Sequence, residues 1–89
     1  MSICESELTA ADYMDCARFF MAGGKYDDGE DAIFVAVEIS GEQRREYMIQ
    51  GKALLIDLLH LPDQALVLGG LPRDEVFEAI NDLEKWEKA

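Results

Sequence analysis

The sequence has few cysteines, and it lacks the pattern of a signal peptide and of a membrane span. Among its 89 residues there are two cysteines, Cys4 and Cys16, which cannot form the disulfide framework of a small secreted domain. Near the start, Glu5 and Glu7 stand where a signal peptide requires positive charge followed by an apolar run. No uncharged apolar stretch approaches the ~20 residues that span a membrane. We therefore expect a cytoplasmic protein with reduced thiols and no membrane segment.

Basic residues are also scarce, since eight lysines and arginines oppose nineteen aspartates and glutamates, for a net charge of −11. Contact with nucleic acid or with an anionic membrane requires a basic patch, so this balance argues against both as direct partners. Residues 1–31 hold eight acids and two bases, residues 32–52 hold three of each, and residues 53–89 hold eight acids and three bases. The charge fits a partner protein with a basic surface, or simple solubility.

Catalytic and metal-binding patterns are equally sparse. Nucleophilic catalysis requires an activated side chain beside a base, and the single histidine, His60, leaves a Cys16–His60 pair as one candidate. The other interpretation is a small core thiol and a partly exposed histidine. Cysteines and histidine lack the spacing of zinc ligands. One dense acidic segment does not match a calcium loop and is interpreted as a solvated turn: Asp27, Asp28, Glu30 and Asp31. The sequence therefore predicts a protein that is not an enzyme and has no metal or cofactor.

The first predicted element is an amphipathic helix over residues 9–22. Thr9 can cap its start, and Asp12 three residues later completes a capping box. Gly23 and Gly24 supply a stop. The apolar side chains recur at three- and four-residue spacing: Ala10, Tyr13, Met14, Ala17, Phe20 and Met21.

A central β-hairpin is predicted next. Residues 32–39 are rich in β-branched and aromatic side chains, which are typical of a strand, and residues 43–49 form the returning strand. A two-residue type II′ turn at Gly41 and Glu42 gives one register of the hairpin, and a three-residue loop gives another. The sequence does not decide between these registers.

Two more helices are predicted in the second half. Residues 52–61 are rich in leucine, a strong helix former, and Pro62 ends the run. Residues 72–88 begin with a proline, which suits the first helical position, followed by acidic residues that suit the positive end of the helix dipole. Residues 65–68 are either a short strand or an irregular extension. The predicted fold is a single α+β domain over residues 1–89, with about three helices on a small antiparallel sheet in the order α-β-β-α-(β)-α.

The predicted helix over residues 52–61 is apolar on nearly all sides, which is unusual for a surface helix. Two interpretations are open. This helix is the central element of the core, or one side of it meets a second copy or another protein. On the second interpretation the predicted interface also includes aromatic residues of the first helix, and its members are Leu54, Leu55, Leu58, Leu59, Leu61, Phe19 and Phe20.

A row of carboxylates at four-residue spacing, Asp74, Glu78 and Asp82, lies on the last predicted helix. Like charges so placed destabilise a helix slightly, so the row is either a solvated face or a surface that pairs with a basic partner. The leading hypothesis is a small acidic regulator or inhibitor that occludes another protein, in the manner of an antiactivator or an immunity protein. It would use an apolar helix surface edged by these carboxylates and would form a homodimer. The alternatives are a nucleic-acid mimic that blocks a DNA-binding protein and, third, a small enzyme or enzyme subunit.

Overall fold

The computed structural model describes residues 8–88, and within that range the chain forms five α-helices, one 3₁₀ turn and no β-strand. The predicted α+β class is therefore wrong, and the fold is all-α. The helices are α1 (Ala10–Ala22), α2 (Tyr26–Ile39), α3 (Arg44–Leu58), α4 (Asp63–Leu68) and α5 (Arg73–Lys88), and the 3₁₀ turn η2 (Gly41–Gln43) connects α2 to α3.

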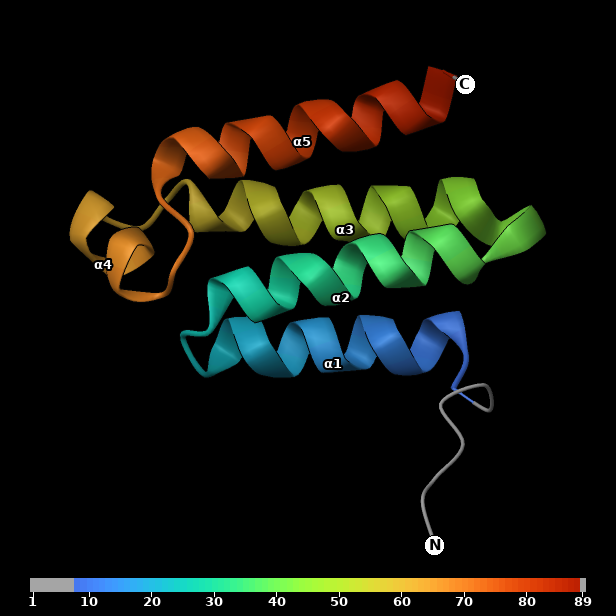
Figure 1. Cartoon of the computed structure of the whole chain (residues 1–89), viewed down its shortest axis with the longest axis horizontal. Coiled ribbons are helices and arrows are strands. Elements are labelled where there is room, and N and C mark those ends of the chain that lie inside the picture. Colours follow the sequence, from blue (N-terminus) through green and yellow to red (C-terminus); the bar gives the residue numbers. More distant parts are fainter. Residues whose placement is uncertain (1–7, 89) are drawn as a thin grey trace, which may run out of the picture.

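The four long helices lie side by side in a flat array, in the order α1, α2, α3, α5, with the short α4 at one end (Figure 1). The Cα atoms extend over 37 × 37 × 14 Å. The axes of the four helices do not lie in one plane, so helices that are not neighbours in the array also touch. Arg18 of α1 donates a hydrogen bond of 2.7 Å to Gln50 of α3. The rings of Phe34 in α2 and Trp86 in α5 are 5.2 Å apart.

The predicted first helix is confirmed, including both of its ends. The Thr9 hydroxyl accepts a hydrogen bond from the Asp12 N–H at 3.2 Å, and the Asp12 carboxylate accepts one from the Thr9 N–H at 2.9 Å. These two bonds satisfy N–H groups that the first turn of a helix cannot satisfy itself. At the other end, the Gly23 N–H bonds back to the carbonyl of Phe19, and Gly24 takes a left-handed conformation with φ of +80°.

The predicted hairpin is wrong, because residues 32–39 belong to α2 and residues 43–49 lie mostly in α3. The acidic segment interpreted as a turn instead lies in the first two turns of α2, where Asp27 and Asp28 are at the positive end of the helix dipole. β-branched residues cost a helix only about 0.5 kcal/mol each, and burial of a large aliphatic side chain contributes more. The buried positions of α2 recur at helical spacing: Gly29, Ala32, Ile33, Ala36 and Val37.

The second half of the chain is helical throughout its main segments. α3 contains the second predicted strand and most of the predicted helix over residues 52–61. Residues 65–68, predicted as a strand or an irregular extension, lie in α4. The predicted helix over residues 72–88 is confirmed as α5, with Pro72 directly before its first residue.

Arg73 holds the segment between α3 and α5 in place. Its guanidinium donates to the carbonyl oxygens of Leu59 at 3.0 Å and Leu61 at 2.6 Å, and it pairs with Asp63 at 2.6 Å. The carbonyl of Gly69, just after α4, accepts hydrogen bonds of 3.0 and 3.2 Å from the first two N–H groups of α2. These contacts fix the start of α5 relative to α2 and α3.

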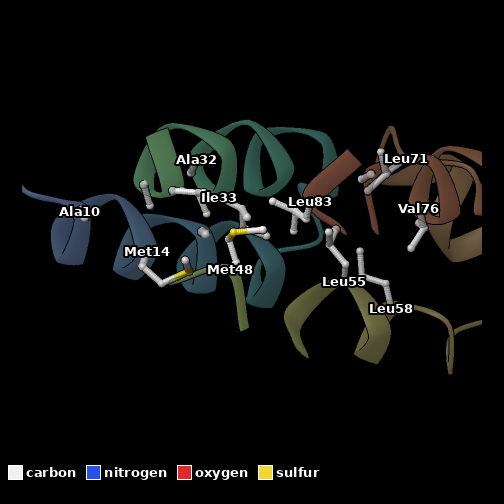
Figure 2. Close-up of a cluster of buried hydrophobic side chains, with 14 of the residues drawn as sticks. Ala10, Met14, Ala32, Ile33, Met48, Leu55, Leu58, Leu71, Val76 and Leu83 are labelled. Atoms are coloured by element: carbon white, nitrogen blue, oxygen red, sulfur yellow. The ribbon is translucent and has the colours of Figure 1, made fainter. Parts of the chain in front are cut away.

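The core lies between the four long helices, and each of them contributes to it (Figure 2). Its largest fully buried side chains are Met14, Ile33, Leu55, Leu66, Leu71, Leu83, Val37 and Val76. At its centre, Gly51 of α3 faces Ile33 of α2 with no space between them. A Cβ atom at position 51 would lie 2.5 Å from Ile33 Cγ2 and 3.6 Å from Leu83 Cδ1. The glycine therefore allows α2, α3 and α5 to approach closely.

We expect Gly51→Ala to destabilise the fold, although alanine is the better helix former by about 1 kcal/mol. The added methyl group overlaps a fully buried, branched side chain, and such overpacking costs about 1–3 kcal/mol. Urea unfolding followed by circular dichroism measures the change. Gly23→Ala is the matched control, because a Cβ there would meet nothing closer than 3.5 Å. Equal midpoints for the two variants would contradict the close approach.

Candidate functional site

The leucines predicted to form an interface contribute mainly to the core. Leu55 and Leu58 are buried, with 0% and 4% of their surface exposed, and the remaining three are half-buried against the core. Phe20 is half-buried, whereas Phe19 is 75% exposed. The outward side of α3 instead carries Ile49 and Ile56, which are 60% and 45% exposed. The three half-buried leucines are Leu54, Leu59 and Leu61.

The predicted carboxylate row divides into two parts. Asp74 and Glu78 are exposed, whereas Asp82 is half-buried in a groove between α2 and α5. The spacing that put the three residues on one side of α5 is correct. Asp82 alone of the three lines the groove, and Asp74 lies eight residues, or about 12 Å, away from it along α5.

We call this hollow the acidic groove, which has a volume of about 550 Å³. α5 contributes Asp82 and Trp86, which are four residues apart and therefore lie on one side of the helix. The rings of Phe34 and Trp86 meet edge to face, with an interplanar angle of 80°, and give the groove an aromatic floor. α2 contributes the other five lining residues: Glu30, Asp31, Phe34, Val35 and Glu38.

Negative charge is concentrated in the acidic groove. Burial raises the pKa of Glu30 to about 7, and the carboxylates of Asp31, Glu75, Asp82 and Asp27 add to the rise in that order. Carboxylates so close together favour either a proton or a cation. A strongly raised pKa in a cleft is a recognised sign of a functional site.

Two cations of the described side chains lie at the groove: Lys85, which pairs with Asp82 at 4.0 Å, and Arg44. Within residues 8–86, whose side chains the structure describes, Glu30, Asp31 and Glu38 have no ion pair. The Arg44 guanidinium lies over the ring of Trp86, 5.3 Å from its centre. A guanidinium is attracted to the face of an indole ring, so this contact is an example of how the aromatic floor can bind an arginine side chain.

The sequence did not predict this groove, although the signal is present in it. Glu30, Phe34 and Glu38 follow one another at four-residue spacing, which places them on one side of a helix. A strand over residues 32–39 also places Phe34 and Glu38 on one side, but it leaves Glu30 in the preceding turn, so the prediction does not join the three residues into one surface. The wrong secondary structure therefore concealed the site.

The other predicted candidates for catalysis, Cys16 and His60, lie outside the acidic groove. Cys16 lines a hollow between α1 and α2, and His60 is exposed in the turn after α3. Within the described part of the chain, no three histidine, cysteine or acidic side chains are arranged to hold a metal ion. Among the helices of residues 8–88, none combines the length and apolar character that a bilayer span requires.

Comparison of the chain with models of protein families, with curated proteins and with solved structures finds no match in any of the three. The geometry and charge of the grooves are therefore the basis for the function proposed below.

Ionisation of Glu30 should make the stability of the fold depend on pH. Its pKa is higher in the folded chain than in the unfolded chain, so its contribution is fully favourable below about pH 4.5 and is lost as the pH rises to about 7. Glu30→Gln removes this dependence, so the variant should gain stability over the wild type across that interval. Thermal unfolding from pH 4 to pH 8 measures the difference. Glu78→Gln is the control for the loss of one charge, and an equal pH profile in both variants would contradict the assignment.

Proposed function

We propose that this protein is a small regulator or inhibitor that binds a basic segment of another protein in the acidic groove and thereby occludes it. The observation that carries the proposal is the combination of an aromatic floor with four carboxylates in one hollow. We further propose that it acts in the cytoplasm and that its action is binding rather than catalysis.

Arginine and lysine side chains suit the acidic groove for two reasons. Their charge would relieve the mutual repulsion of the carboxylates around Glu30, so binding is coupled to loss of the Glu30 proton. Their aliphatic stems and, for arginine, the planar guanidinium would pack on Phe34 and Trp86. Imitation of nucleic-acid phosphates requires no aromatic floor, so the Phe34–Trp86 pair favours a peptide over the DNA-mimic alternative.

Neutralising the groove should weaken binding of a basic peptide. The probe is a synthetic 16-residue peptide with four arginines among alanine, leucine and phenylalanine, and calorimetry in low salt measures its affinity. The double variant Glu30→Gln/Asp82→Asn should lose about tenfold, because partly buried charge pairs contribute more than pairs at an exposed rim. Rising salt should also weaken binding to the wild type.

The matched control is Asp74→Asn/Glu78→Gln, which also replaces two carboxyl groups by amides, at exposed positions of α5 outside the groove. We expect less than a twofold change for it. Equal losses in the two double variants would mean that net charge, and not the groove, attracts the peptide. No measurable binding of the peptide to the wild type would reject the proposed function.

We also propose that two copies associate through the outward side of α3. Ile49 and Ile56 are exposed there beside Lys52, in a shallow hollow of about 300 Å³. α3 carries three bases and two acids, whereas α2 carries five acids and no base. Two chains that each have a net charge of −11 therefore repel one another least across α3.

Neighbouring substitutions in α3 separate association from folding. Light scattering of the wild type should give twice the chain mass of 10.0 kDa. Ile56→Glu should give a monomer that stays helical, because its side chain already faces solvent. Leu55→Glu should lose the helical signal, since a carboxylate buried without a partner costs several kcal/mol. A wild type that is monomeric at all concentrations would contradict the association.

A further inference from the structure

A hollow of about 650 Å³ lies where the start of α1 meets the end of α2. None of its ten lining residues is charged, although the chain as a whole is 30% charged. We call it the uncharged groove. Its apolar walls are formed chiefly by Leu8, Tyr13, Val35, Ile39 and Tyr47, of which Leu8, Val35 and Ile39 are exposed.

The uncharged groove and the acidic groove are parts of one surface. Val35, on the outward side of α2, lines both of them. A third hollow of about 290 Å³ between α1 and α2 joins them, since it shares Tyr13 and Val35 with the uncharged groove and Asp31 and Val35 with the acidic groove. A single bound chain can therefore cross α2 at Val35 and contact both grooves.

We infer that the bound segment of the partner protein has two unlike halves, with large apolar side chains in the uncharged groove and arginine or lysine side chains in the acidic groove. This inference rests on the proposed function and adds the composition and placement of the ligand. Each groove disfavours binding of the half of the segment that the other groove accepts. A charge entering the uncharged groove would lose water without gaining a partner, and an apolar side chain in the acidic groove would cover carboxylates and leave them unpaired.

The fold also sets the spacing of the two halves. Ile39 and Glu30 mark the two grooves on α2 and are nine residues apart, which is about 14 Å along a helix. An extended ligand would cover this distance in about four residues and a helical ligand in about nine. The spacing found in bound sequences therefore reports the conformation of the ligand.

Selection from a random library of 16-residue peptides displayed on phage tests the inference on the full chain. We expect enriched sequences to carry arginine or lysine in one half and large apolar residues in the other. Enrichment of basic residues with no apolar half would overturn the inference and leave the proposed function standing. Enrichment without basic residues, or no enrichment, would overturn both.

Variants of the protein then test where the apolar half binds, with the most enriched peptide as the probe. Ile39→Ser, in the uncharged groove, should weaken binding about tenfold, and Val67→Ser, at an exposed position of α4 outside the grooves and the proposed dimer surface, should change it less than twofold. Replacing the apolar half of the peptide with serine should abolish the effect of Ile39→Ser, since the two changes then remove the same contact. An effect of Ile39→Ser that persists with the altered peptide, or equal effects of the two variants, would overturn the inference.

Discussion

The contact between Ile33 and Gly51 is the constraint on which the rest of the structure depends. Because α3 presents no side chain at that point, the buried side chains of Ile33 and Leu83 both lie close to the backbone of α3 at Gly51. With Ile33 directed inward, the helical period of α2 fixes where every other residue of that helix lies. Glu30 and Phe34 then lie toward α5, and Val35 lies outward. The acidic groove is thus a consequence of core packing, and a change at the core should alter binding.

The charge of the chain is divided among the helices in a way that gives the two proposed surfaces different properties. α2 carries five carboxylates and no base, and its Asp31 and Val35 line both the acidic groove and the hollow along α1. α3 is the one long helix of the described chain with more bases than acids, and its exposed isoleucines lie on the side away from the core. Association across α3 would leave the acidic groove of each copy open. A homodimer would therefore present two sites, and a partner with two basic segments would bind it more tightly than either segment alone.

The sequence predicted those features that depend on local chemistry. The capping box at Thr9 and Asp12, the glycine stop after α1 and the last helix are all confirmed. The hairpin failed because residues 32–39 are apolar on both sides, so neither the period of a strand nor that of a helix was visible in them. Packing against Gly51 decided the outcome, and that contact joins residues far apart in the chain. For the same reason the sequence identified the acidity and Asp82 but not the aromatic floor, which exists only when α2 and α5 lie together.

The central claim is that the acidic groove, and not the acidity of the chain as a whole, recognises basic segments. The most direct measurement is a titration of isotope-labelled protein with an arginine-containing peptide, followed by two-dimensional NMR of the backbone amides. The account predicts that the largest shifts cluster at residues 30–38 of α2 and 82–86 of α5, together with the indole N–H of Trp86. Shifts of equal size over all acidic residues, including Asp74 and Glu78, would contradict it.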